Sequence, residues 1–376
     1  MEKTSKQKLL TEEQLEEKIS KEEMNLVEYP FTLLTRRAPR GVKTLKYFDW
    51  ITVGGVKKQV KWIVTGSDEF GLPIGGDQDI WVAIMEVWRE HGFKEDKIPI
   101  GSIYRMLKKM GLPTDKRNYD RFKKGLDRLR GTYIKTEYAI WDKTDQCYIA
   151  TKGFSMIGNY YLLERHRKGD KTEPFPLGYI LADPFVYQMI KKGYLKDLNL
   201  TFYYSLSTPL TKRLYRYLDK KRYLTSVFSI ELYRFIKKMG LLIENLPPSR
   251  VKQTLNPALD ELRKRGFLKD YSYQKTADGK GQKIIFFFNQ LPAKVTRLTQ
   301  EDGQIELLVE DILAVCKDRH SEPFYKKVAQ LLPEQVVRRA ISEVKASVLQ
   351  GEVKTSPGKL FTHLIKKYAQ DFGIVL

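Results

Sequence analysis

A nearly repeated segment constrains the fold of this chain more than any other feature. Residues 103–112 read IYRMLKKMGL, and residues 232–241 read LYRFIKKMGL. In each copy four apolar residues lie at positions i, i+3, i+4 and i+7, which predicts an amphipathic helix with one buried face. The repetition therefore predicts two related helical units in one chain.

The residues around each repeated segment resemble helix ends. Ser102 and Ser229 lie where an N-cap residue would stand, because a serine hydroxyl can accept a hydrogen bond from the first turn. Gly111 and Gly240 follow the last apolar position, where a left-handed C-cap residue is common. We therefore expect both helices to begin and end alike.

A second basic helix is predicted after each repeat, at residues 117–134 and 249–268. The segment GLDRLRGTYI of the first matches ALDELRKRGFL of the second, and the second copy has a longer turn, IENLPPS, before its helix. Asn256 and Pro257 fall inside the second helix, where proline removes a backbone donor. Either this helix is kinked there, or Asn256 caps a new helix that starts at Pro257.

Strand patterns follow each pair of helices, and a further helix precedes it. The predicted hairpins are TYIKTEYAIWD with QCYIATKGFSMIGNYYLL, and FLKDYSYQ with GQKIIFFFN. The preceding helices span residues 79–92 and 209–223, and the second opens with Ser207, Thr208 and Pro209 as cap and first-turn proline. Three helices followed by a hairpin are typical of a winged helix-turn-helix, whose second turn helix enters the DNA major groove. We therefore expect an α+β fold with two tandem winged helices.

The formal net charge of +21 is concentrated in the same region. Residues 1–24 carry 5 Lys and 7 Glu, and residues 293–376 carry 13 basic and 11 acidic residues, so the excess lies between them. A concentrated basic charge is typical of nucleic-acid binders, because each neutralised phosphate releases counterions. The other interpretation is a basic protein whose lysines are merely solvated.

Helix geometry nominates the residues that contact DNA. Arg and Lys can bind guanine O6 and N7, and Asn and Gln can bridge adenine N6 and N7. For the first copy the expected base contacts are Asn118, Arg121 and Lys124. The neighbouring Lys123 is also expected in the interface, and Arg128 and Arg130 on phosphate. For the second copy the expected base contacts are Arg250, Lys252, Gln253 and Asn256, with Arg263, Lys264 and Arg265 on phosphate. The expected wing contacts to phosphate are Lys143, Lys275, Lys280 and Lys283.

Enzymatic chemistry has little support in the sequence, and we expect no catalytic residue, metal or cofactor. No phosphate-binding G-x-x-x-x-G-K-[ST] loop occurs, and the four histidines are scattered without a metal-ligand spacing. Cys147 lies in a predicted strand, where a buried thiol acts as a small hydrophobe. With Cys316 it gives only two cysteines and no disulfide framework. No long apolar run or secretory leader is present, so a cytoplasmic protein without membrane contact is expected.

Four regions are expected along the chain. They are a charged flexible arm at 1–24, a first winged-helix domain at 25–176, a second at 177–292 and a helical C-terminal segment at 293–376. The basic stretch 164–176 would link the two domains. The tail shows helix signals at 305–316, 333–349 and 356–370. The aromatic stretch TFYYSL, residues 201–206, is expected as a core strand, with stacking on single-stranded bases as the alternative.

Several segments together resemble the plasmid replication initiator protein A family. They are NLVEYPFTLLTRRAP, GLPIGGDQDIWVAIM, TFYYSLSTPLTKRLYRYLDKKRY and the paired YR/KKMGL helices, and the resemblance covers residues 25 to 290. That family is similar to iteron-binding initiators built from two winged-helix domains. The resemblance implies binding of direct repeats in double-stranded DNA at a plasmid origin, strand opening, and recruitment of the host initiator and replicative helicase.

Two functional classes follow from these observations. The favoured one is a replication initiator with two unequal readers, for which one asymmetric site would cover two major-groove turns, roughly 34 Å apart. The alternative is a winged-helix transcriptional regulator without initiation activity. A homodimeric regulator would prefer a palindrome, and self-association of this chain as a dimer is left open.

Overall fold

The structure is a computed structural model that describes residues 18–35, 39, 41–53, 56–145, 147–162, 178–222, 226–276, 279, 281–289, 302–332, 334–349, 355–371 and 376. The chain divides into two compact units. The first is Met1–Tyr217 with Leu232–Glu261, and the second is Leu218–Glu231 with Leu262–Leu376. The predicted linker 164–176 and the predicted boundary at 292 lie outside the described residues.

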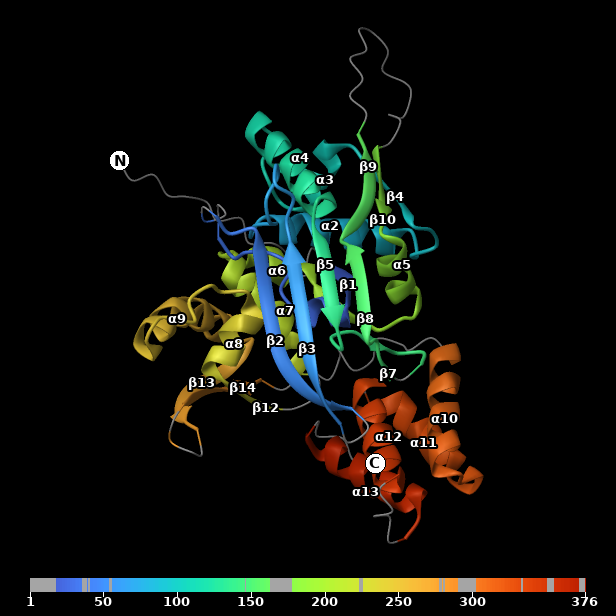
Figure 1. Ribbon diagram of the computed structural model, residues 1–376. Coiled ribbons are helices and arrows are strands. Elements are labelled where there is room, and N and C mark those ends of the chain that lie inside the picture. The colour runs from blue at the N-terminus through green and yellow to red at the C-terminus, as the bar shows by residue number, and fades with distance from the viewer. Residues whose placement is uncertain are drawn as a thin grey trace, which may run out of the picture. The chain divides into compact units, whose positions relative to one another are not determined.

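The chain combines helices with short antiparallel strands (Figure 1). The helices are α1 (Met24–Glu28), α2 (Asp77–Glu90), α3 (Ile103–Lys109), α4 (Lys116–Arg130), α5 (Pro184–Lys191), α6 (Leu200–Ser205), α7 (Pro209–Arg222), α8 (Leu232–Met239), α9 (Pro248–Lys264), α10 (Asp302–Cys316), α11 (Glu322–Leu331), α12 (Glu334–Leu349) and α13 (Pro357–Asp371).

The strands form several small sheets. They are β1 (Ile19–Glu23), β2 (Thr44–Val53), β3 (Val56–Thr65), β4 (Lys97–Gly101), β5 (Tyr133–Glu137), β6 (Trp141–Asp142), β7 (Cys147–Tyr148), β8 (Thr151–Ser155), β9 (Ile157–Tyr161), β10 (Gly178–Ala182), β11 (Leu195–Asn199), β12 (Val227–Glu231), β13 (Leu268–Lys275) and β14 (Gln282–Phe288). The strand orders are β1-β11, β4-β10-β9, β2-β3-β5-β8, β6-β7 and β12-β14-β13.

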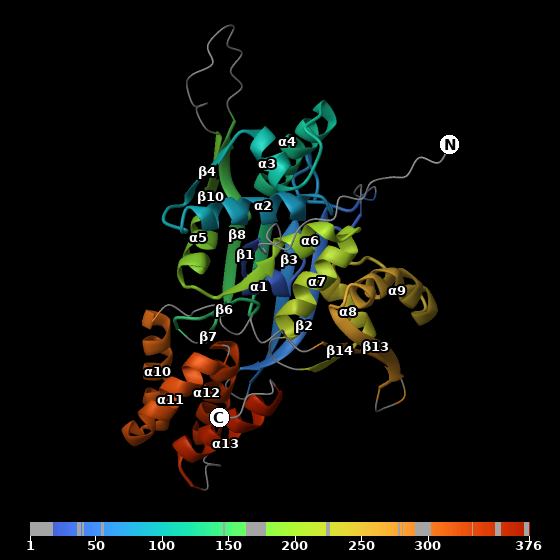
Figure 2. The ribbon, with the colours of Figure 1, turned by 180° about the vertical axis from the view of Figure 1, so that it is seen from behind.

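The core of the first unit lies on one face of the β2-β3-β5-β8 sheet. Trp62 of β3 is fully buried, its ring stacks on Tyr29 with 4.9 Å between ring centres, and its indole N–H donates to the carbonyl of Pro30 at 2.8 Å. Trp81 of α2 packs edge-on against Phe31 in the same cluster. Figure 2 shows α1 and α2 on this side of the strands. One face of the sheet is thus committed to the core.

The N-terminal segment differs from the expected flexible arm. Residues 19–23 form strand β1, which pairs antiparallel with β11 from Ile19↔Asn199 to Glu23↔Leu195. Alternation explains the difference, because polar Ser20 and Glu22 point inward and are buried. Glu22 binds the buried cations Arg216 and Lys196, so charge in this segment does not indicate exposure. Residues 1–17 lie outside the described part of the chain.

The repeated helices end as predicted but begin differently. Ser102 caps α3 by accepting from the amide of Arg105 at 3.2 Å, whereas Ser229 is wrong as an N-cap because it belongs to strand β12. Gly111 and Gly240 have φ of +68° and +77°, a left-handed conformation that glycine adopts without strain. Both predicted C-caps are therefore confirmed.

The strand before each repeated helix finds a different partner in the two copies. In the second copy β12 pairs with β14, which also pairs antiparallel with β13 as the predicted hairpin requires. In the first copy β4 pairs with β10, while β5 pairs with β3 on one side and with β8 on the other. The short strands β6 and β7 pair with each other on either side of the turn at Lys143 to Asp145. The copies thus share an element order but not a sheet.

Two local expectations are wrong. Residues 201–205 of the stretch TFYYSL lie in helix α6 instead of a strand, and Asn199 caps this helix by accepting from the amide of Phe202 at 2.8 Å. Tyr203 is nonetheless fully buried, so packing is its role. Cys147 does lie in a strand, β7, but this strand has only two residues and the thiol is exposed instead of buried.

The C-terminal helices of the second unit have a core of their own. The predicted helices at 305–316, 333–349 and 356–370 correspond to α10, α12 and α13, and α11 is an additional helix with buried Tyr325 and Val328. The buried residues of this core lie between Ile305 and Ala369 in the sequence.

Candidate nucleic-acid interface

The N-terminus of α4 is fixed by local hydrogen bonds. Asp115 caps the helix by accepting from the amide of Asn118 at 2.8 Å. The side-chain amide of Asn118 donates to the carbonyl of Pro113 at 2.9 Å, which closes the turn between α3 and α4. Asn118, predicted as a base contact, therefore already uses one donor to shape the turn, and its side chain is half-buried.

The outward face of α4 carries the cations that the sequence nominates. Arg121, Lys124 and Arg130 are exposed, and Lys123 is half-buried. The guanidinium of Arg121 lies over the backbone of Gly76, where a Cβ atom would be 2.1 Å from its Nη2. Because glycine has no side chain, position 76 leaves room for the Arg121 guanidinium.

Arg128 has an internal role in α4. Its Nε and Nη2 donate to the two carboxylate oxygens of Asp77 at 2.6 and 2.8 Å, and this carboxylate also accepts from the amide of Ile74 at 2.7 Å. Asp77 is buried, and the Arg128 side chain is mostly so. Such a bidentate pair fixes α4 on the start of α2, so Arg128 holds the helix that presents the other cations.

Helix α9 is the counterpart of α4 in the second copy, and it runs without interruption through Pro257. The account in which a new helix begins at Pro257 is therefore wrong. Its inward residues Val251, Leu255 and Leu259 are fully buried. Its outward positions include Arg250 and Gln253, which are exposed and joined by a hydrogen bond of 2.9 Å between Arg250 Nη1 and Gln253 Oε1. The remaining predicted contacts are half-buried Lys252 and Asn256 and exposed Arg263, Lys264 and Arg265.

The predicted wing residues occupy three different settings. Lys275 is exposed at the end of β13, and Lys283 is half-buried on β14 opposite Gln274. Lys143 lies at the β6–β7 turn, where its ammonium donates to the carbonyl of Gly193 at 3.1 Å. Lys280 lies outside the described residues.

Two cations shared by the repeated helices, the arginine and the second lysine, bind carboxylates in both copies. In α3, Arg105 pairs with Glu90 at 3.1 Å, and Lys109 binds Glu86 at 2.9 Å and also Glu90. Burial alone would lower the pKa of Lys109, but the two carboxylates raise it above its usual value.

The equivalent residues of α8 find other partners. Arg234 donates to Asp49 at 2.7 Å, and Lys238 binds Glu28 at 2.7 Å while lying over the rings of Tyr29 and Tyr47. The repeated arginine and the second repeated lysine therefore anchor each helix to the body of the first unit. They are not free cations for DNA.

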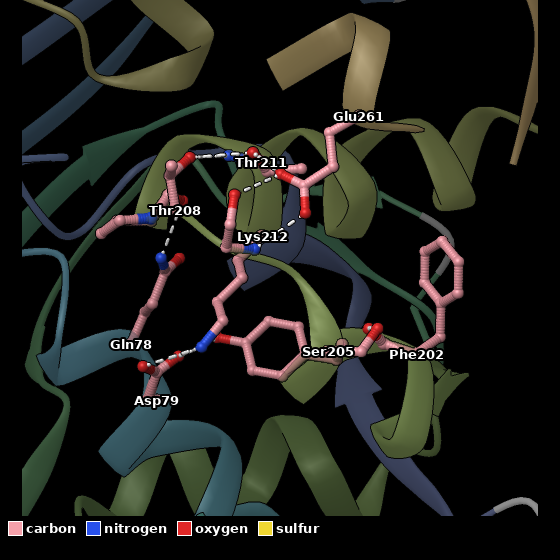
Figure 3. A network of polar contacts seen from close by, with 11 residues as sticks. Gln78, Asp79, Phe202, Ser205, Thr208, Thr211, Lys212 and Glu261 are labelled. Atoms are coloured by element: carbon pink, nitrogen blue, oxygen red, sulfur yellow. Dashed lines mark hydrogen bonds and ion pairs between the residues drawn. The ribbon is translucent and has the colours of Figure 1, made fainter. Parts of the chain in front are cut away.

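A polar network joins α2 to the helices of the second copy within the first unit (Figure 3). Asp79 of α2 accepts from the ammonium of Lys212 at 3.0 Å and from the hydroxyl of Tyr203 at 2.8 Å. Gln78 donates to the carbonyl of Pro209 at 2.9 Å. Both α2 residues thus form hydrogen bonds with the first turn of α7.

Glu261 connects the same helix start to α9. Its carboxylate accepts from the amide and hydroxyl of Ser207 at 2.9 and 2.6 Å, and from the hydroxyl of Thr211 at 2.9 Å. The network therefore runs from the first copy, through α7, to the helix that corresponds to α4. The sequence analysis did not predict this network. The one local sign of it is Asp79 in the first turn of α2, since acidic residues there stabilise a helix.

The same unit contains a buried ionic group beneath α7. Arg216, buried in the core, donates through Nε to Glu22, and Lys196 Nζ lies 3.1 Å from the same carboxylate. Burial alone would raise the pKa of Glu22, but the charges of Arg216 and Lys196 lower it. Within the described residues, no three metal-binding side chains gather into a site, and no helix is long and apolar enough to cross a membrane.

Comparison with known proteins identifies the family. The family model for Replication initiator protein A matches residues 21–258. Among solved structures, the chain is similar to a crystal structure of RctB domains 2-3, with 13% identity, a TM-score of 0.41, and coverage of 67% of this chain and 94% of that chain. A structure of SeMet derivatives of domains 2 and 3 of RctB gives 14% identity, a TM-score of 0.41, and coverage of 68% and 94%. No curated protein sequence matches. Because the family model spans well over half of the chain, the chain belongs to the Replication initiator protein A family.

Proposed function

We propose that this protein is a sequence-specific double-stranded DNA-binding initiator that acts at repeated sites of a plasmid origin. Two tandem winged helices, residues 25–176 and 177–292, would read DNA through α4 and α9. The observation that carries this proposal is the matched pair of basic helices. Each follows a helix anchored by the same Arg and Lys positions and presents exposed cations on its outward side.

The outward residues of the two helices suit base reading. Arg121 and Lys124 on α4, and Arg250 and Gln253 on α9, are exposed and carry donors that match guanine or adenine edges. Arg130, Arg263, Lys264, Arg265 and Lys275 are exposed and suit phosphate. Opening of the origin and recruitment of the host initiator and replicative helicase belong to the same proposal and rest on the family.

Selection of bound duplexes from a random DNA pool, near physiological salt, tests this function. We expect one asymmetric motif covering about two turns of DNA, because two unequal readers would share one chain. Recovery of a palindrome would support a dimeric transcriptional regulator instead. Recovery of no motif would leave only unspecific attraction between the net charge of +21 and phosphate.

A further inference from the structure

The second face of the β2-β3-β5-β8 sheet is open and carries aromatic rings. Strand residues alternate between faces, so Leu45 and Tyr47 point into the core while Phe48 and Trp50 point away from it. Phe48 is 47% exposed, Trp50 is 53% exposed, and Tyr133 of β5 on the same face is 51% exposed. Figure 1 looks onto this face, with β2, β3, β5 and β8 in view.

The pairing registers place these rings on one continuous surface. Phe48 lies opposite Lys61, Trp50 opposite Gln59, and β3 continues to β5 through the pair Ile63↔Lys135. Residues that pair directly across antiparallel strands point to the same face. The Tyr133 ring also reaches over Gly153 of β8, where a Cβ atom would be only 2.0 Å from the tyrosine hydroxyl. Glycine at this position lets the ring lie across the strand.

Cations surround the rings. The lysines on this face are Lys46, Lys57, Lys61 and Lys135. Lys57 Nζ lies 5.1 Å from the centre of the Trp50 ring. Glu137, the acid that the described strands place on this face, is paired with Lys61 at 2.7 Å, and Asp49 points to the opposite face, toward Tyr47 and Arg234. The surface therefore combines stacking groups with net positive charge.

We propose that this face, which we name the aromatic sheet face (Phe48, Trp50 and Tyr133 with Lys46, Lys57 and Lys135), binds single-stranded DNA. Exposed rings stack on unpaired bases of any sequence, and neighbouring lysines neutralise the phosphates of the strand. This inference rests on the proposed function, because an initiator that opens its origin must meet single strands. It assigns the two forms of DNA to separate surfaces.

Duplex DNA and protein fit this face less well. In a duplex the base faces are stacked on each other, and the major groove admits a helix or a two-stranded ribbon but not a four-stranded sheet. Protein interfaces are depleted of lysine, whereas this face has lysines beside each exposed ring of β2. An unpaired polyanion with exposed bases matches both features.

Binding of a fluorescently labelled oligothymidylate of about 16 nucleotides to the full-length protein tests the inference. We expect Trp50→Ala to weaken this binding about 5- to 100-fold and to leave binding of the selected duplex unchanged within about twofold. Trp50→Phe keeps a stacking ring and should retain most of the affinity. Phe70→Ala is the matched control, since Phe70 is an exposed aromatic residue of the same unit outside this sheet.

The outcomes separate this inference from the proposed function. Unchanged oligothymidylate binding in Trp50→Ala and in the double variant Phe48→Ala with Trp50→Ala would overturn the inference, as would an equal loss in Phe70→Ala. Stronger binding of an oligouridylate of the same length would overturn DNA as the occupant. If no duplex motif is ever selected, the proposed function fails, while the oligothymidylate comparison still decides on this face.

Discussion

Lys109 and Lys238 occupy equivalent positions in the two repeated helices, and a carboxylate binds each ammonium group at 2.9 and 2.7 Å, from Glu86 and Glu28 respectively. The two acids lie in different elements, α2 and α1. The repeated lysine thus anchors its helix in both copies, although the acid that binds it differs between the copies.

We expect Lys109→Met to lower the free energy of unfolding by about 2–3 kcal/mol, somewhat below the loss typical of a fully buried pair. The reason is that Glu86, which is 7% exposed, would lose its counter-ion. Urea unfolding measures the change. The adjacent Lys108→Met is the control: Lys108 is exposed, so its loss should change stability by no more than about 0.5 kcal/mol. Equal effects of the two variants would contradict the anchoring role.

Acid should weaken the first unit through Glu22. Because Arg216 and Lys196 lower the pKa of Glu22, its pairing stabilises the fold above the unfolded-state pKa of about 4.3, and this contribution is lost as pH falls through the lower folded-state pKa. Glu22→Gln should remove part of the pH dependence in this acidic range. At pH 7 it should also destabilise the protein by about 3–5 kcal/mol, since it leaves two buried cations unpaired. Thermal unfolding across pH 3 to 7 would show both effects.

Gly125 allows α4 to lie directly on α2. A Cβ atom there would be 2.2 Å from Ile80 Cδ1 and 2.8 Å from Asp77 Oδ1, and Arg128 already holds that carboxylate. We therefore expect Gly125→Ala to cost about 1–3 kcal/mol of stability, although alanine favours a helix. Urea unfolding again gives the measurement. A stabilised variant would show that α4 can move away from α2 without loss.

Arg121→Ala and Arg250→Ala should relax base specificity at particular positions of the selected motif. A bidentate contact between arginine and guanine contributes about 1–3 kcal/mol of discrimination, so the affected position should tolerate other bases. Lys275→Ala, at an exposed wing position, should weaken binding to all sequences alike and reduce the salt dependence. Selection from the random pool, repeated with each variant, distinguishes the two patterns. A uniform loss from the arginine variants would refute the assignment of base contacts.

The C-terminal helices should fold without the rest of the chain. Their buried cluster is drawn from residues 305 to 369, including fully buried Tyr325, Phe361 and Ile365. We expect a fragment of residues 302–376 to show helical circular dichroism and a cooperative thermal transition. A gradual, non-cooperative loss of helix would show instead that this segment depends on other parts of the chain.

Local patterns in the sequence predicted the helices well, because they depend on neighbours a few residues apart. The apolar spacing located α3, α4, α8 and α9 to within a few residues, and glycine marked the left-handed ends of the repeated helices. The internal roles of Arg128 and Lys109 could not be read in this way. Their partners, Asp77 and Glu86, lie far away in sequence, and a cation on a helix looks the same whether it faces solvent or a buried acid.

Strand partners were the least predictable part of the fold. Nothing local to β4 indicates that it pairs with β10 and not with the hairpin that follows it, because pairing is decided by long-range contacts. The aromatic sheet face has a local signal in the sequence: in KYFDWI both alternating sets contain aromatic residues, so aromatic side chains lie on both faces of the strand.

The network of Figure 3 has a consequence for how two half-sites bound by α4 and α9 would be rotated relative to each other about the DNA axis. Arg128 binds α4 to Asp77 at the start of α2, Asp79 and Gln78 of α2 bind α7, and Glu261 binds α9 to the start of α7. These contacts connect α4 and α9 within one body. The angle between the readers would then be fixed. DNA turns once in about 10.5 base pairs, so inserting about 5 base pairs between the halves of a site would rotate one half to the far side of the helix. A protein built in this way would measure the helical repeat of its target as well as its bases.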